Sequence, residues 1–149
     1  MKKRNLFVCV TLAVTLFMGV LNLSTNISKA ATNEIKVQIL QSSADSTNTI
    51  NPNFKIINTG SNNLDAKNIK IRYYYTVDTT KAQTFVCDWS TAGIVNVAGT
   101  FNNLANPTAT ADCYLEITFK SSYIITPGNS IFLNTRIFKT DYSNYNQKK

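Results

Sequence analysis

The sequence contains no histidine among its 149 residues. This absence excludes Ser–His and Cys–His nucleophile pairs and metal sites built on imidazole. Carboxylate chemistry stays open, because a glycosidase needs only two acidic side chains about 5–10 Å apart. The acidic residues of the chain are Glu34, Asp45, Asp65, Asp78, Asp88, Asp112, Glu116 and Asp141. A single domain of this size offers little depth for a catalytic cleft, so we expect a non-enzyme with no catalytic residue.

Long apolar runs are also lacking, except near the N-terminus. Lys2, Lys3 and Arg4 precede an apolar run from Leu6 to Leu23, and Ser28-Lys29-Ala30 then supplies small residues at the −3 and −1 positions. This pattern predicts a signal peptide over residues 1–30, cleaved before Ala31, and a secreted chain over residues 31–149. The alternative is a membrane anchor, but the uninterrupted apolar core is short for a span and no stop-transfer flank follows.

Strong charge is missing from the remaining chain. The full sequence has a formal charge of +7, but four of its 15 Lys and Arg residues lie in residues 1–30. Eleven basic residues then stand against eight acidic ones, which leaves about +3. A nucleic-acid binder needs a clustered basic face, and the sequence has none. We therefore expect no nucleic-acid partner, and no membrane partner after signal cleavage.

Cysteine is scarce. Of the three cysteines, Cys9 belongs to the expected signal peptide, which leaves Cys87 and Cys113 in predicted strands. In an exported protein such a pair forms either a disulfide or two buried thiols. The sequence leaves both alternatives open, because a bridge requires Cα atoms within about 7 Å.

Helical periodicity is absent after residue 30, and short segments of period two alternate with turn residues instead. This pattern is typical of an all-β sandwich with one core. Turn signals stand at Asn58-Thr59-Gly60-Ser61, Asn106-Pro107 and Pro127-Gly128-Asn129. The predicted strands are Glu34–Leu40, Asn53–Asn58, Asn68–Val77, Gln83–Asp88, Ile94–Phe101, Asp112–Lys120 and Ser130–Lys139.

In two of these predicted strands, the alternation of residue types indicates which side chains face the core and which face outward. In Asn68–Val77, Tyr73 and Tyr75 share a face with isoleucines and are expected in the core, whereas Tyr74 points the other way. In Ser130–Lys139, one face is aliphatic, and the other combines Asn134 and Arg136 with two phenylalanines, Phe132 and Phe138. A face that mixes polar and aromatic groups is typical of a contact surface.

Two further aromatic residues stand beside acidic residues at strand ends. Trp89 follows Asp88, and Tyr142 follows Asp141. Flat aromatic rings pack on the C–H faces of sugars, while neighbouring polar groups bind hydroxyls. The pair therefore indicates polysaccharide binding on a rigid surface. The alternative is that both rings are partly buried at the rim of the core.

Several motifs follow one another in consistent order from about Glu34 to Gln147. They are Ile50-Asn51-Pro52-x-Phe54-Lys55, Asn58-Thr59-Gly60-Ser61, Arg72-Tyr73-Tyr74-Tyr75-Thr76-Val77-Asp78, Gln83-Thr84-Phe85-x-Cys87-Asp88, Ala111-Asp112-x-Tyr114-Leu115-Glu116-Ile117 and Asp141-Tyr142-Ser143-Asn144-Tyr145. This set of motifs resembles the family 3 carbohydrate-binding modules of clostridial cellulases and scaffoldins. The resemblance implies a nine-stranded jelly-roll β-sandwich whose flat face lies on cellulose.

The resemblance also assigns a binding strip. Its Asp–Arg ion pair falls on Asp88 and Arg136, and its stacking positions fall on Trp89 and Tyr142. Its polar anchoring positions fall on Asn48 and Asn134, with Ser43 as a further match. The implied function is a secreted, non-catalytic module that binds cellulose or a related β-glucan, alone or within a cellulolytic assembly.

Two departures from the family pattern bear on this expectation. Between Trp89 and Gly99 the chain is shorter than in cellulose-binding members and lacks a tyrosine of the strip. The alternative is therefore an interaction or structural protein of the same fold, which contacts protein or cell wall and has lost or weakened cellulose binding.

The second departure concerns a structural Ca²⁺ that the family holds. Its ligand positions fall on Thr76, Asp78 and Asn146, but Gln147-Lys148-Lys149 follows where an Asn-Asp pair is expected. Calcium needs about 6–8 oxygen ligands, normally including carboxylates. We therefore expect a degenerate Ca²⁺ site.

Overall fold

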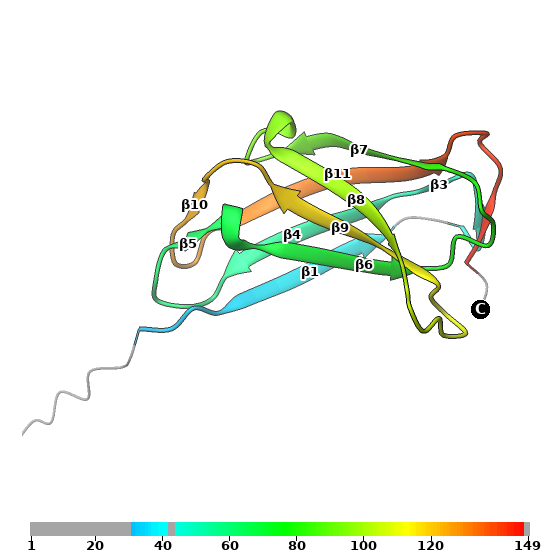
Figure 1. The fold of residues 1–149 in the computed structure, drawn as a ribbon. Helices are drawn as coiled ribbons and strands as arrows, with labels where there is room; N and C mark the ends of the chain where they lie inside the picture. The colour runs from blue at the N-terminus through cyan, green and yellow to red at the C-terminus, as the bar shows by residue number, and fades with distance from the viewer. Residues whose placement is uncertain (1–30, 42–43, 148–149) are drawn as a thin grey trace, which may run out of the picture.

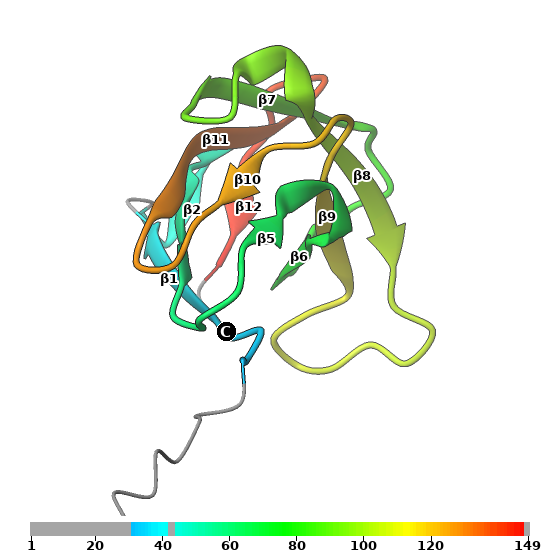
Figure 2. The same cartoon turned by 90° about the vertical axis from the view of Figure 1, so that its left-hand side faces the viewer.

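The computed structural model describes residues 31–41 and 44–147 (Figure 1). The expected signal peptide over residues 1–30 and Ser43 lie outside the described residues. Two antiparallel sheets face each other as two layers, which are viewed from one end in Figure 2. We call the five-stranded sheet the floor and the three-stranded sheet the roof. This arrangement confirms the all-β sandwich expected from the sequence.

The floor follows the order β1–β4–β11–β3, with β7 also paired to β11. Its strands are β1 (Ile35–Gln41), β3 (Thr49–Ile50), β4 (Pro52–Asn58), β7 (Gln83–Ser90) and β11 (Ser130–Lys139). The roof contains β6 (Lys70–Tyr75), β8 (Val97–Asn103) and β9 (Cys113–Phe119), with β9 in the centre. Within the described residues, eight strands belong to these two sheets and four short strands lie outside them.

Short elements join the sheets at their ends. β5 (Leu64–Asp65) pairs with β10 (Ile124–Ile125), and β2 (Ser46–Thr47) pairs with β12 (Tyr145–Asn146). Within the described residues, the helical segments are two one-turn 3₁₀ helices, η1 (Ala66–Asn68) and η2 (Ile94–Asn96). None of the described helices has the length and apolar character required to cross a membrane.

β3 and β4 are one strand interrupted at Asn51. Ile50 lies opposite Ile137, and Phe54 lies opposite Leu133, so both pairs have the same register on β11. At the interruption the Thr135 hydroxyl donates to the Pro52 carbonyl, and the Thr135 N–H donates to Asn53 Oδ1 at 3.0 Å. These bonds replace the missing ladder contacts between β11 and the interrupted strand.

The core lies between the sheets and follows the predicted alternation. Ile131, Leu133 and Ile137 of β11 are fully buried, and burying such a side chain contributes about 1.5–3 kcal/mol. Tyr75 is buried at 2% exposure, while Tyr74 is 50% exposed, so the predicted parity of the tyrosine strand is confirmed. The intervening side chains of β11 consequently point outward.

β1 departs from this pattern, although its register is as the sequence predicts. Val37 lies opposite Ile56 and Ile39 opposite Phe54, which places both on the core face. Nevertheless Val37 and Ile39 remain 49% and 50% exposed. β1 is the edge strand of the wider floor, and the roof ends at β6. The inner face of β1 therefore lacks a complete cover among the described residues.

Cys87 and Cys113 are free thiols, so the disulfide alternative is not formed. Each Sγ lies near a backbone carbonyl, Cys87 near that of Trp89 at 3.4 Å and Cys113 near that of Tyr75 at 3.5 Å. Burial raises the pKa of the Cys113 thiol to about 12. Both cysteines therefore pack as small apolar side chains.

Candidate functional site

The outer face of the floor brings most of the predicted site residues together. Asn134 and Arg136 point outward from β11 because the residues between and beside them are buried. Trp89 of β7 lies opposite Asn134. Its side chain is 50% exposed, so the alternative of a ring buried at the rim does not hold for Trp89.

A β-bulge places Asp88 on the same face as Trp89. Strict alternation would send these adjacent side chains to opposite faces. The register of β7 on β11 shifts between Asn134 and Thr135, which lie opposite Trp89 and Cys87. Asp88 is therefore the extra residue of the bulged strand. Its Oδ1 accepts a hydrogen bond from Arg136 Nε at 3.1 Å, which forms the ion pair that the resemblance implies.

Tyr142 joins this surface through Phe138, a residue of the outer face of β11 that the family resemblance did not assign to the binding site. Its ring stacks on Phe138 with 5.3 Å between centroids and 4° between planes. The Arg136 guanidinium lies 5.9 Å from the centroid of the same Phe138 ring. The aromatic and polar groups thus continue along β11 from Trp89, through the ion pair, to Tyr142. We call Asp88, Trp89, Arg136, Phe138 and Tyr142 the strip.

The turn after β11 determines where Tyr142 lies. Tyr142 has a φ of 56°, and its N–H donates to the Lys139 carbonyl at 2.9 Å. Asp141 Oδ1 accepts from the N–H and hydroxyl of Ser143, at 3.1 and 2.8 Å. These bonds, together with Lys81 at 3.2 Å, lower the pKa of Asp141 to about 2. The turn is therefore closed by a carboxylate that is ionised at neutral pH.

A buried lysine supports the same turn from beneath. Lys139 is fully buried, its Nζ donates to the Asn144 carbonyl at 2.6 Å, and it lies 4.5 Å from the centroid of the Tyr145 ring. These contacts compensate for desolvation of the charged group. Lys139 thereby ties the end of β11 to the segment that follows Tyr142.

The two predicted anchoring residues lie at different ends of the strip. Asn134 is adjacent to Trp89 across the strands. Asn48 is exposed, and its Oδ1 accepts from the Thr49 hydroxyl at 3.1 Å. Thr49 lies opposite Phe138, so Asn48 belongs to the end of the floor that carries Tyr142.

The connection between β7 and β8 carries no tyrosine. It contains η2, in which Ile94 and Val95 are 51% and 81% exposed. The predicted strand from Ile94 therefore begins only at Val97. β8, which follows this connection, packs closely on β7, because a Cβ on Gly99 would lie 2.5 Å from the Phe85 ring.

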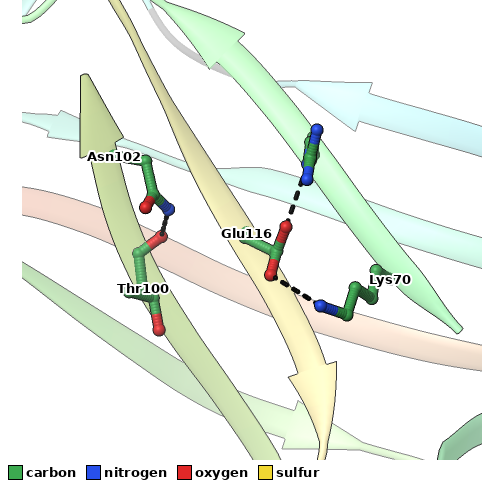
Figure 3. A network of polar contacts seen from close by, with 5 residues as sticks. Lys70, Thr100, Asn102 and Glu116 are labelled. Atoms are coloured by element: carbon green, nitrogen blue, oxygen red, sulfur yellow. Dashed lines mark hydrogen bonds and ion pairs between the residues drawn. The ribbon is translucent and has the colours of Figure 1, made fainter. Parts of the chain in front are cut away.

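The outer face of the roof is a second, more charged surface. Glu116 pairs with Arg72 Nε at 2.9 Å and with Lys70 Nζ at 3.4 Å (Figure 3). These partners, Arg72 first, lower the pKa of Glu116. Tyr74 and Tyr114 are 5.4 Å apart with planes tilted by 42°, and the Arg72 guanidinium lies over Tyr114 at 4.9 Å. Tyr74 and Tyr114 are thus tilted against each other, unlike the parallel rings of Phe138 and Tyr142.

The predicted Ca²⁺ ligands lie close together but face N–H donors. Asp78 Oδ2 accepts from the Asn146 N–H at 2.9 Å, and the Thr76 carbonyl accepts from Gln147 Nε2 at 3.0 Å. Among the described residues, no group of three or more His, Cys, Asp or Glu is placed to hold a metal. A Ca²⁺ shell requires about 6–8 oxygens, so these residues do not fit the ion. The described tail is held by hydrogen bonds instead.

Comparisons with known proteins agree with this fold. A family model described as cellulose binding domain matches residues 34–149. Cellulosomal-scaffolding protein B of Acetivibrio thermocellus is 43% identical over 123 residues, which cover 76% of this chain and 16% of that protein. Anti-sigma-I factor RsgI4 of the same species is 45% identical over 93 residues, which cover 62% of this chain and 18% of that protein. This chain thus spans less than a fifth of either relative.

A solved structure, the CBM3a-L domain with flanking linkers from scaffoldin cipA of the Clostridium thermocellum cellulosome, superposes with a TM-score of 0.73. It is 41% identical, and the match covers 79% of this chain and 75% of that one. The similarity to larger proteins is confined to their binding module. This chain therefore belongs to the family 3 carbohydrate-binding modules.

Proposed function

We propose that this chain is a secreted module that binds cellulose, or a related β-glucan, through the strip. The observation that carries the proposal is the exposure of two aromatic rings, Trp89 at 50% and Tyr142 at 61%, on either side of the Asp88–Arg136 pair. The rings offer flat apolar faces to sugar rings, while the ion pair offers a donor and an acceptor to hydroxyls between them.

The anchoring residues and the rigidity of the sheet support the same function. Asn134 and Asn48 hydrogen-bond hydroxyls beside the two aromatic positions. Because the strip is built largely on paired strands and a closed turn, docking on a polymer orders few additional groups. Binding by the strip needs neither a catalytic residue nor a metal.

Secretion is part of the proposal. The N-terminal pattern supports a signal peptide over residues 1–30 and a binding module over residues 31–149. N-terminal sequencing of the protein recovered from the medium should start at Ala31. Material that stays in the membrane fraction and starts at Met1 would contradict this part of the proposal.

The binding test is depletion of the secreted chain by microcrystalline cellulose, chitin and xylan, with and without EDTA. Each well-stacked ring is worth about 1–2 kcal/mol by analogy with base stacking, so Trp89→Ala and Tyr142→Ala should each weaken cellulose binding about 5- to 30-fold. Tyr74→Ala is the matched control, because Tyr74 is equally exposed but lies on the roof. EDTA should change nothing.

Thermal unfolding of each variant separates loss of binding from loss of fold. Equal retention on cellulose of the wild type and of the Trp89→Ala/Tyr142→Ala double variant would reject the strip as the binding surface. A loss of cellulose binding in Tyr74→Ala as large as that in Trp89→Ala would indicate that the roof is the binding surface.

A second candidate function is an interaction or structural module that contacts protein or cell wall. The β7–β8 connection favours it, because Ile94 and Val95 are exposed where the resemblance expects a tyrosine of the strip. A wild-type chain that is depleted by none of the three polysaccharides, together with normal folding, would favour this candidate.

A further inference from the structure

A hollow of about 270 Å³ interrupts the outer face of the floor beside the strip. Phe132 and Asn134 of β11 border it, together with Asn53 and Lys55 of β4 and Leu40 of β1. Phe132 lies opposite Lys55, and Leu40 lies opposite Asn53, so these side chains surround one point of the sheet. Asn134 is common to the hollow and to the predicted binding surface.

The lining combines apolar and polar groups as a sugar site does. Phe132 is 40% exposed and Leu40 is 70% exposed. Asn53 Oδ1 already accepts from the Thr135 N–H at 3.0 Å, which leaves its amide nitrogen to donate. Lys55 Nζ lies 4.9 Å from the centroid of the Phe132 ring, and such an exposed cation–π contact is worth only about 0.5–1 kcal/mol. A stacked sugar ring can therefore displace the ammonium toward a hydroxyl.

The aromatic side of the hollow is held in place by the backbone. The Phe132 N–H donates to Thr91 Oγ1 at 3.1 Å, and the Phe132 carbonyl accepts from the Thr91 N–H at 3.2 Å. Thr91 follows directly after β7. The residue that positions Phe132 thus continues the strand that carries Trp89, so hollow and strip are parts of one rigid surface.

Shape and size narrow the ligand. Pockets for drug-sized molecules occupy about 300–1,000 Å³, so this hollow suits about one sugar ring. A linear glucan that lies flat on the strip passes over a hollow without filling it. A ring that projects sideways from the chain can enter, because neighbouring strands are only about 5 Å apart and alternate residues of one strand about 7 Å apart.

We propose that the hollow binds a single pyranose ring that branches from the β-glucan chain on the strip. The inference rests on the proposed function and makes it more specific: the strip binds the backbone, and Phe132 stacks on the branch. Asn134 and Asn53 donate to branch hydroxyls. The module then distinguishes a β-glucan with ring-shaped branches from an unbranched one.

Affinity electrophoresis of the full chain tests this proposal with two soluble polymers that share a β-1,4-glucan backbone. Xyloglucan carries pyranose branches, whereas hydroxyethylcellulose carries acyclic substituents. The wild type should bind xyloglucan about 5- to 30-fold more tightly, the amount expected of one additional stacked ring at about 1–2 kcal/mol. Phe132→Ala should abolish this preference and leave binding to hydroxyethylcellulose and microcrystalline cellulose unchanged. Tyr74→Ala should keep it.

The outcomes separate the two proposals. Cellulose binding without a preference for xyloglucan overturns the hollow and leaves the strip intact. The hollow is also overturned if Phe132→Ala weakens binding to both soluble polymers equally, or if the more conservative Phe132→Leu retains the full preference. A wild type that binds neither cellulose nor either soluble polymer overturns the strip as well.

Discussion

Phe138 provides the most specific test of how the strip is built, because it acts through another residue. Its ring lies flat beneath Tyr142, at 5.3 Å and 4°, and Tyr142 is 61% exposed above it. An aromatic pair contributes about 0.5–1.5 kcal/mol beyond area burial. Phe138→Ala should therefore lower the equilibrium ratio of flat to other orientations of the Tyr142 ring by about 2- to 13-fold.

The change in the orientation of Tyr142 sets an upper limit on the loss of cellulose affinity in Phe138→Ala. The apparent dissociation constant rises only as the fraction of flat Tyr142 falls, so Phe138→Ala should weaken cellulose binding by less than about 13-fold. It should also weaken binding less than Tyr142→Ala does. In the Phe138→Ala/Tyr142→Ala double variant there is no Tyr142 ring for Phe138 to position. The affinity of this variant for cellulose should therefore equal that of Tyr142→Ala alone.

Depletion isotherms on microcrystalline cellulose for the four proteins of this double-mutant cycle give the coupling. Phe138→Tyr is the matched control, because it keeps a ring beneath Tyr142 and should bind as the wild type does. Additive losses of cellulose affinity in the double variant, with an unchanged melting temperature, would refute the claim that Phe138 acts only by positioning Tyr142. They would mean that Phe138 contacts the polysaccharide directly.

Two further predictions concern stability. Ile56→Ala removes a fully buried side chain and should cost about 2–5 kcal/mol in urea unfolding, whereas Ile39→Ala should cost about 1 kcal/mol, because Ile39 is 50% exposed and leaves no closed cavity. Equal losses would mean that the inner face of β1 is covered in solution. The folded pKa of Asp141 lies below its ordinary value of 3.8, at about 2, so its stabilising effect is complete above 3.8 and disappears as the pH falls through about 2. The melting-temperature difference between the wild type and Asp141→Asn should narrow over this interval, and a constant difference would contradict the role of the carboxylate.

Much of the fold could be predicted because alternation directly encodes the two faces of a strand. The parity of Tyr73, Tyr74 and Tyr75 is confirmed by their burial, as is the outward direction of Asn134 and Arg136. Burial of apolar side chains dominates folding, so a pattern of period two largely fixes which side of each strand faces the core. The ion pair between Asp88 and Arg136 formed at the positions that the family resemblance implied.

The sequence did not reveal which side chains from different strands come into contact in the folded protein. Phe138 has no signal that distinguishes it from Phe132, yet one supports Tyr142 and the other borders a hollow. Likewise the alternation of β1 correctly assigned its core face but could not show that the roof leaves that face half exposed. Exposure depends on what lies above a strand, and that depends on sheet width.

The sequence by itself thus determined an all-β sandwich, its inward and outward residues, and the residue types available for binding a polysaccharide. Only the tertiary structure decided that Asp88 and Trp89 share a face, since a bulge against β11 offsets the alternation that would separate them. It alone placed Tyr142 on Phe138 and opened a hollow beside Asn134. The physical reason is that alternation is a property of one strand, whereas a binding surface is set by the register and packing of several.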